Sequence, residues 1–551
     1  MKTDIRIAQE AALKPIEDIG KKAGFKASEI EPHGKHKAKI NLSALKRLSR
    51  KKDGKLVLVT TISPTPQGEG KTTVTIGLAQ ALAKIGEKAF VAIREPSLGP
   101  VMGVKGGAAG GGYSQVLPME DINLHFTGDM HAITSAHNLL AALIDNNIYH
   151  GNSLGIEPGR ITWKRAMDMN DRALRKISID LRDLSRESGF DITASSEVMA
   201  VMCLSQSLED MKKRLSRMMV GFSYKWKPIT ALMLKAQGAM ALLMKDALKP
   251  NLVQTIEGVP AFVHGGPFAN IAHGCNSLMA TKIALKSADY VVTEAGFGTD
   301  LGAEKFFNIK CRIGKLKPSA AVLVVTVKAL KRQGGIEKDK LALENPAAVE
   351  AGLPNLYKHV ENIKLFNVPL VITINRNPSD TEAEISVIRE NCASWGLPIV
   401  VCDVWAGGGR GGRELAREVV KACSKKNDFK PLYDADSPLD EKVELIAKKI
   451  YGAAGVGYSP EAERDMREIR ELGLEKMPVC VAKTQYSLSD DPRKLNRPKN
   501  FDINLKKFRV SAGAGFIVAY AGDIVTMPGL PKVPAAEAID INEKGRIRGL
   551  F

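Results

Sequence analysis

The segment TTISPTPQGEGKTT, residues 60–73 of this 551-residue chain, constrains the fold more than any other segment. A β-rich run over residues 55–62 leads into it, and a helix-patterned stretch follows it and stops at Gly86. Strand, glycine-rich loop and helix, in this order, form a phosphate cradle, because the glycines let backbone N–H groups turn toward an anion and the helix N-terminus adds a favourable dipole. The segment therefore predicts a P-loop that binds ATP.

The chemistry expected of this loop falls mainly on two residues. Lys71 should reach the β- and γ-phosphates, and the hydroxyl of Thr72 should bind Mg²⁺. The pattern G-x-x-x-x-G-K-[ST] is incomplete, because Thr65 stands where the first glycine is usual. A chance Gly-Lys-Thr turn is the alternative, and the flanking strand and helix disfavour it. The expected nucleotide-binding residues are Thr65, Pro66, Gly68, Glu69, Gly70, Lys71, Thr72 and Thr73.

Length and composition are typical of a multidomain globular protein. At 551 residues the chain is too long for one hydrophobic core, so we expect two or three domains. No apolar run has the length of a membrane span, and the acid-containing N-terminus does not resemble a signal peptide. Seven cysteines without C-x-x-C spacing are typical of reduced, buried thiols. We therefore expect a cytoplasmic protein with no membrane partner.

The net charge of +18 has three interpretations: nucleic-acid binding, attraction of small anionic substrates, or a soluble surface. Aromatic residues make up only 5% of the chain, and no stacking motif of a single-strand binder is present. The densest basic stretch, residues 34–55, is spaced like a solvated helix face. A cleft for polyanionic small molecules therefore fits better than a nucleic-acid partner.

Strand-like and helix-like segments alternate along most of the chain, which predicts an α/β fold with a mainly parallel sheet. Residues 163–251, rich in Leu and Met, favour helices, and residues 369–402 form a further strand–helix–strand unit. We expect three parts: a P-loop α/β domain (1–360), a second, smaller α/β domain (361–507) and a small β-rich closing unit (508–551).

A second glycine cluster follows the expected strand that leads to Arg94. The block GVKGGAAGGGYSQ, residues 103–115, is too rich in glycine for a regular element, and such blocks mark backbone held close to a ligand or another chain. The alternative, a disordered linker, is disfavoured by the ordered composition of residues 116–128. Arg94 should lie at the same sheet edge as Lys71. Two fixed cations there suit transfer of a phosphoryl group to an anionic acceptor.

These motifs together carry a family resemblance. The chain resembles formate–tetrahydrofolate ligase, also called 10-formyltetrahydrofolate synthetase, in its single-activity prokaryotic form. The resemblance covers essentially the whole chain and rests on segments that include PTPQGEGKTT (64–73), REPSLGPVMGVKGGAAGGGYSQVLPMEDINLHFTGD (94–129), VHGGPFANIAHGCNS (263–277), TEAGFGTDLGAEKFFNIKCR (293–312), AKTQYSLSDDP (482–492) and MPGLP (527–531). It implies an enzyme that ligates formate to tetrahydrofolate with ATP, and a homotetramer.

The resemblance also implies parts for particular residues. Formate and ATP would give formyl phosphate and ADP, and N10 of tetrahydrofolate would then attack the formyl carbon. Lys71 and Arg94 would act on the anions, with His264 nearby as a third catalytic residue. The alternative for His264 is a turn histidine bonded to backbone. Glu294 would bind Mg²⁺ or the monovalent cation, K⁺ or NH₄⁺, that the family uses, or else serve as a structural partner of a helix N-terminus.

The expected pterin site departs from the family pattern. In the family a flat pterin is stacked between the aromatic residue of an I-N-x-F segment and the Trp of W-A-x-G-G. Trp405 keeps the second position, whereas Asn377 stands where Phe is usual, at a cost of about 1 kcal/mol of stacking unless Arg376 lies over the ring instead. The departure leaves open the same ligase chemistry on a different reduced pterin. The expected substrate-binding residues are Trp405, Asn377, Gly408, Gly409 and Tyr113.

Proteins of another class share part of the pattern. P-loop ATPases that partition cargo or deliver metals have the same loop and sheet, but they act through protein partners and do not need the glycine-rich block. A nucleic-acid-stimulated ATPase would need stacking aromatics and an hhhhD-E strand, neither of which is present. A ligase that acts on small molecules is therefore the favoured interpretation.

Overall fold

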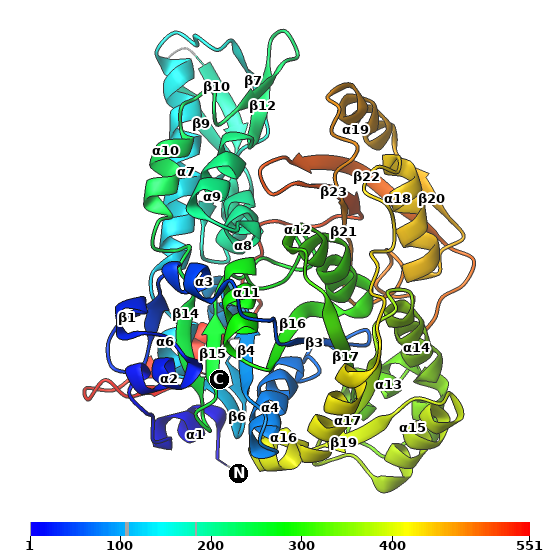
Figure 1. Cartoon of the computed structure of the whole chain (residues 1–551). Coiled ribbons are helices and arrows are strands. Elements are labelled where there is room, and N and C mark those ends of the chain that lie inside the picture. Colours follow the sequence, from blue (N-terminus) through cyan, green and yellow to red (C-terminus); the bar gives the residue numbers. More distant parts are fainter. Residues whose placement is uncertain (1, 105–108, 182–183, 551) are drawn as a thin grey trace.

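A large mixed sheet forms the centre of the molecule (Figure 1). The computed structural model describes residues 2–104, 109–181 and 184–550, so residues 105–108 of the glycine-rich block lie outside the described residues. Along its main path the sheet contains, in spatial order, β1 (Ile30–Pro32), β2 (Ala38–Ile40), β14 (Asn251–Thr255), β15 (Pro260–Val263), β4 (Ala89–Ile93), β16 (Tyr290–Gly298), β3 (Lys55–Thr61), β17 (Pro318–Val325), β18 (Leu370–Asn375) and β19 (Ile399–Cys402).

The strands from β15 to β19 along this path all run parallel, and both faces of this part of the sheet are buried. Alternate residues of β3 enter two different cores. Leu56 and Leu58 share one core with α11 (Leu278–Ser287) and α14 (Pro346–Lys364). Val57 and Val59 share the other with α4 (Lys71–Lys84) and α17 (Arg413–Ser424). Continuous apolar strands between two helical layers confirm the expected α/β fold.

The strands expected in a second α/β unit do not form a sheet of their own. β18 pairs with β17 in parallel, with Leu370 opposite Ala321, and β19 pairs with β18. β18 covers the open edge of β17, and β19 covers that of β18, so the main sheet continues past residue 360. The division of the chain at residue 360 stays a prediction, but it does not separate two sheets.

The sheet near the C-terminus also contains strands from before residue 508, and the boundary of a closing unit at 508 stays a prediction. This sheet has the order β20 (Gly455–Tyr458), β22 (Asp502–Ser511), β23 (Phe516–Ala521) and β21 (Val479–Ala482). β20 and β21 have only four residues each, so they lack the alternation over many residues that makes a strand recognisable. The predicted unit starts at residue 508, which lies within β22.

The composition of residues 163–251 predicts a helical region, but the structure has both helices and strands there. Their helices are α8 (Glu197–Leu204), α9 (Leu208–Ser216) and α10 (Gln237–Leu243). A small sheet of β7 (Ile156–Ile161), β12 (Met219–Ser223) and β13 (Pro228–Thr230) accompanies them. Figure 1 shows this lobe at upper left along the long helix α7 (Asp129–Tyr149), and the C-terminal sheet at upper right.

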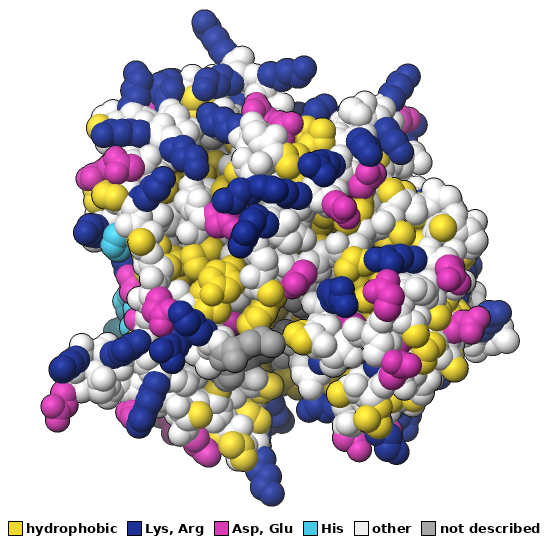
Figure 2. Space-filling model, turned by 90° about the horizontal axis from the view of Figure 1, so that it is seen from below, with side chains coloured by type: hydrophobic (Ala, Val, Ile, Leu, Met, Phe, Trp, Pro, Cys, Tyr) yellow, Lys and Arg dark blue, Asp and Glu magenta, His cyan; other side chains and the backbone are white. Residues whose placement is uncertain are grey.

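The surface charge is distributed rather than concentrated on the face shown in Figure 2. Lys and Arg side chains lie there among acidic and apolar ones and do not form one continuous stripe. A nucleic-acid-binding face would require such a stripe. Within the described part of the chain, none of the helices combines the length and the apolar character needed to cross a bilayer.

Candidate active site

Expected site residues lie at the ends of neighbouring strands along one edge of the sheet. Because parallel strands end at the same edge, the loops after them lie in a row. In the order β4, β16, β3, β17, β18 and β19, the row carries Arg94 after β4, Glu294 within β16, the P-loop after β3, Asn377 after β18 and Trp405 after β19; no expected site residue follows β17. The structure therefore brings residues more than 300 positions apart in the chain to one continuous edge.

The segment predicted to be a P-loop, residues 60–73, which keeps that name below, has the backbone that its glycines favour. Gly68 and Gly70 have φ values of 81° and 65°, a left-handed conformation that glycine adopts without strain. Gly70 directly precedes α4, which begins at Lys71. A Cβ atom on Gly70 would lie 2.4 Å from Nδ2 of Asn375, so a larger residue would also collide with the neighbouring loop.

Glu69 explains why the first glycine of the motif is dispensable. Its Oε1 accepts a hydrogen bond of 2.6 Å from the backbone N–H of Thr65, and its Oε2 accepts one from the hydroxyl of Thr326. Thr65 does not have a positive φ, so no glycine is required there. Glu69 is 5% exposed and braces the loop from inside.

Thr72 and Glu294 meet beside the loop. The Thr72 hydroxyl donates a hydrogen bond of 2.8 Å to Oε2 of Glu294, which is buried near the end of β16. A hydroxyl and a carboxylate are hard oxygen donors of the kind that Mg²⁺ prefers, and Mg²⁺ takes its other ligands from phosphates and water. Within the described residues no group of three or more His, Cys, Asp and Glu side chains is placed to hold a metal. The pair therefore suits a nucleotide-bound Mg²⁺.

A pocket of about 730 Å³ opens between the P-loop and the segments that follow β17, β18 and β19. Besides P-loop residues, it is lined by Thr326, Lys328, Asn375, Arg376, Asn377, Pro378, Asp403, Trp405 and Ala406. Trp405 is the one aromatic side chain among these described lining residues. The pocket thus places the expected pterin wall within one cavity with the expected phosphate cradle.

The side chain of Asn377 turns back toward its own loop. Its Oδ1 accepts a hydrogen bond of 3.1 Å from the Ser379 hydroxyl, and its backbone N–H donates to Asp380 at 2.8 Å. Such turns are typical of Asn and would not form with Phe. Arg376, next to it, is exposed and lines the same pocket.

Three of the expected substrate-binding residues lie behind Trp405 rather than in the pocket. Tyr113 donates its backbone N–H to the carbonyl of Trp405 at 2.8 Å, and Gly409 donates to Glu257 at 2.8 Å. A Cβ atom on Gly408 would lie 2.5 Å from Oε1 of the same glutamate. These residues hold the tryptophan loop in place and do not line the pocket.

Arg94 lies on the other side of the P-loop from this pocket. It follows β4, and its Nη1 donates to the carbonyl of Pro267 at 3.3 Å. Its Nε is buried and has no hydrogen-bond partner among the described residues. Gly296 makes room for it, because a Cβ atom there would lie 3.0 Å from Nη1. Arg94 therefore retains a buried donor that no described residue uses.

His264 is fully buried, and both of its ring nitrogens are occupied. Nε2 donates to the carbonyl of Ala247 at 2.7 Å, so Nδ1 is the acceptor for the Ser277 hydroxyl at 2.6 Å. Burial lowers the pKa of His264 to about 4, so the ring is neutral near pH 7. These contacts favour the alternative of a histidine that holds its turn.

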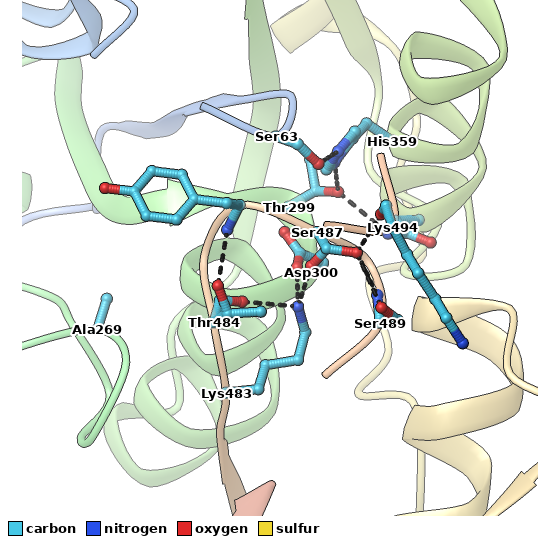
Figure 3. Close-up of polar contacts among 12 residues, drawn as sticks. Ser63, Ala269, Thr299, Asp300, His359, Lys483, Thr484, Ser487, Ser489 and Lys494 are labelled. Carbon is cyan, nitrogen blue, oxygen red and sulfur yellow. Dashed lines mark hydrogen bonds and ion pairs between the residues drawn. The ribbon is translucent and has the colours of Figure 1, made fainter. Parts of the chain in front are cut away.

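A buried polar network behind the P-loop was not foreseen from the sequence (Figure 3). His359 bridges Ser63, just before the P-loop, and Thr299, just after β16, at 3.1 and 2.6 Å. Lys483 forms a fully buried ion pair of 2.8 Å with Asp300. Lys483 belongs to AKTQYSLSDDP, a segment that carried the family resemblance without an assigned part.

Fold and site first define a class: an α/β protein whose candidate ligand-binding loops line the carboxyl edge of a mainly parallel sheet. The family model described as formate--tetrahydrofolate ligase matches residues 2–551. The chain therefore belongs to the formate–tetrahydrofolate ligase family, as the sequence motifs indicated. It is a ligase that forms a C–N bond, and its family implies ATP and tetrahydrofolate as substrates.

Proposed function

We propose that the chain uses ATP to join formate to tetrahydrofolate through formyl phosphate, which yields 10-formyltetrahydrofolate, ADP and phosphate. The observation that carries the proposal is the order of loops along one sheet edge. A cation (Arg94), an oxygen pair (Thr72 and Glu294), a P-loop and a pocket with Trp405 follow one another in that row. The phosphoryl acceptor would bind near Arg94, the nucleotide at the P-loop and the pterin in the pocket, so the three would be neighbours.

The first step is attack of a formate oxygen on the γ-phosphorus of ATP, with departure of the β–γ bridging oxygen on ADP. Formate is ionised at neutral pH, because carboxyl groups lose their proton near pH 4, so the step needs no general base. The barrier comes from bringing two anions together in line. Lys71, at the start of α4, and Arg94, after β4, would offset that repulsion with their positive charges.

Cations complete the proposed nucleotide site. Thr72 and Glu294 would hold Mg²⁺, which neutralises phosphate charge when it is bound. A monovalent cation, K⁺ or NH₄⁺, remains part of the proposal by family resemblance. Because Glu294 already accepts from Thr72, we assign it to Mg²⁺ first.

In the second step N10 of tetrahydrofolate attacks the formyl carbon, the C–O bond to phosphate breaks, and the amine proton leaves with the released phosphate. The pterin ring would lie against Trp405 in the pocket beside the P-loop. Arg94 would hold formyl phosphate between the two steps, because its buried Nε has a donor that no described residue uses. We further propose a homotetramer.

Measuring ADP release with each substrate omitted in turn tests the proposal. ADP should appear at a sustained rate only when formate and tetrahydrofolate are both present, and 10-formyltetrahydrofolate should accumulate with it. Lys71→Ala should abolish turnover, because an uncompensated γ-phosphate raises the barrier by several kcal/mol. Lys46→Ala, at an exposed lysine of α3 (Ser43–Leu48), is the control. ADP release at the same rate with and without formate and pterin would favour a P-loop ATPase that partitions cargo or delivers metals.

A further inference from the structure

Two fully buried lysines lie behind the loop that contacts Arg94. Lys305 and Lys310 come from the helical segment after β16, one before and one within η5 (Phe306–Cys311). The ammonium of Lys305 donates to the carbonyl of Ala269 at 2.5 Å. That of Lys310 donates to Oδ1 of Asn276 at 2.8 Å and to the Thr281 hydroxyl at 2.9 Å. All of these partners are uncharged.

Three other buried lysines have a carboxylate partner, whereas Lys442 is bonded to backbone carbonyls. Lys39 pairs with Asp129, Lys331 with Glu384 and Lys483 with Asp300, at 2.7 to 2.8 Å. Among the described residues, no ion pair joins Lys305 or Lys310 to a carboxylate. Burial of an unpaired charge is costly, so such a charge is retained where an opposite charge arrives with a ligand.

The nearest acids do not supply that opposite charge in full. Glu95 is buried, and burial together with neighbouring Asp129 raises its pKa well above the usual range. Glu304, next to Lys305 in sequence, accepts from Asn308 at 2.7 Å, and burial raises its pKa to about 7. Neither of these acids forms an ion pair with Lys305 or Lys310 among the described residues, so they leave the two ammonium groups without a charged partner.

The positive charges converge on the same loop. Burial, reinforced by the charges of Lys310, Lys305 and Arg94, lowers the pKa of His273 to about 3. Burial raises the pKa of the Cys275 thiol to about 11, and the same three cations act against this rise. His273 is fully buried, and neither of its ring nitrogens has a partner among the described residues. Open polar atoms surrounded by cations indicate a place where a small anion is held.

Lys310 is linked to the site through this loop. Asn276, its partner, follows Cys275, which forms an isolated β-bridge with Ala295. Ala295 stands between Glu294 and Gly296, the residue that makes room for Arg94. The charge of Lys310 therefore lies one loop behind the anion site and does not need to touch the ligand.

We propose that Lys310, assisted by Lys305, is a positioning residue for the anionic substrate, and that its buried charge holds formate and the transferred phosphoryl group beside Arg94. The inference rests on the proposed function for the identity of the anion. It predicts that the affinity for formate, rather than that for the pterin, depends on this lysine.

Lys310→Met removes the charge and keeps most of the side-chain volume. We expect the KM for formate to rise at least tenfold and the KM for tetrahydrofolate to stay within twofold of the original. The Tm should stay level or rise, because replacing an unpaired buried charge by an apolar group relieves its desolvation. The matched control is Lys442→Met on α18 (Leu439–Leu445), since Lys442 is also buried and bonded only to carbonyls, of Glu475 and Met477. Its formate KM should not change.

Asn276→Asp tests the charge without removing the lysine. The new carboxylate would face the Lys310 ammonium across the existing 2.8 Å contact and cancel its field. We expect a rise in formate KM of at least tenfold, with Tm unchanged or higher. A purely structural Lys310 would gain an ion pair from this change and lose no formate affinity. The second variant also decides the matter if Lys310→Met fails to fold.

The pH profile gives a separate readout. Burial lowers the pKa of Lys310, whereas it raises the pKa values of the thiols that face it, Cys203 on α8, Cys275 and Cys311, so these thiols stay neutral. As pH rises, Lys310 should therefore lose its proton before these thiols lose theirs. The formate KM of the unsubstituted chain should rise as that charge is lost. The Lys310→Met variant should lack this alkaline rise.

The outcomes separate this inference from the proposed function. If both variants keep the formate KM within twofold of the original, or if the alkaline rise persists in Lys310→Met, Lys310 does not position the anion. If the original chain itself shows no formate-dependent turnover, the proposed function fails before either variant is compared.

Discussion

The hydroxyl of Thr72 donates a hydrogen bond of 2.8 Å to the carboxylate of Glu294, which lies 222 residues further along the chain. The contact joins the first turn of α4, directly after the P-loop, to the adjacent strand β16. It exists because β3 and β16 are parallel neighbours, with Glu294 opposite Val59. The pair is the part of the site that is best suited to a divalent cation.

Removal of the negative charge at this pair should weaken Mg²⁺ binding. For Glu294→Gln we expect the Mg²⁺ concentration required for half-maximal turnover to rise about tenfold, because a carboxylate ligand is replaced by a neutral amide. A titration of turnover against Mg²⁺ at fixed ATP measures this. Glu382→Gln, on the exposed face of α15 (Glu382–Ser394), is the control. An unchanged Mg²⁺ requirement would make Glu294 a structural partner of the helix.

Arg94 should matter more for the reaction than for the nucleotide. For Arg94→Ala we expect kcat to fall about a hundredfold or more, because a fixed cation is lost where phosphoryl charge develops. The Kd for ADP should change little, since Arg94 lies on the far side of the P-loop from the pocket. Parallel measurement of product formation and ADP binding checks this. Equal losses in both would instead assign Arg94 to the fold or the nucleotide.

Trp405 should dominate pterin affinity, because it is the aromatic wall of the pocket. Trp405→Ala should raise the KM for tetrahydrofolate about tenfold and leave the formate KM near its original value. Asn377→Phe should lower the KM for tetrahydrofolate about fivefold, the equivalent of about 1 kcal/mol of stacking. If neither change moves any pterin KM, the pterin binds elsewhere.

Asn377→Phe also breaks the hydrogen bond to Ser379. Ser379→Ala is therefore its control, because it removes that bond without adding a ring. Weaker binding of tetrahydrofolate by Asn377→Phe, together with tighter binding of another reduced pterin, would point to a different substrate.

Buried histidines should make the fold sensitive to mild acid. Burial lowers the pKa values of His137, His264 and His359 to about 4, and that of His273 to about 3, from 6.5. The unfolded chain therefore binds protons that the folded chain does not, and stability falls as pH drops from about 6.5 to 4. We expect Tm to decrease over this range and His137→Gln to reduce the decrease. Exposed His131→Gln should leave it unchanged.

Local sequence determined much of the site. The order of strand, glycines, Lys71 and helix predicts the P-loop, because the turn and the helix start depend on residues within a few positions of one another. The apolar strands likewise predict a parallel sheet, and that sheet places Arg94 and Glu294 at one edge. The motifs were also sufficient to identify the family.

Tertiary structure decided how these elements are supported. The sequence does not show that Glu69 accepts a hydrogen bond from Thr65, that the Asn377 side chain is bonded to Ser379 in its own loop, or that residues 369–402 extend the main sheet. Nor does it show that Lys483 is paired whereas Lys310 has only neutral partners. Periodicity and turn chemistry are local properties, whereas burial and charge pairing depend on which distant segments meet. The sequence alone does not distinguish a lysine that pairs with a carboxylate from one that bonds to a carbonyl or binds an anionic ligand.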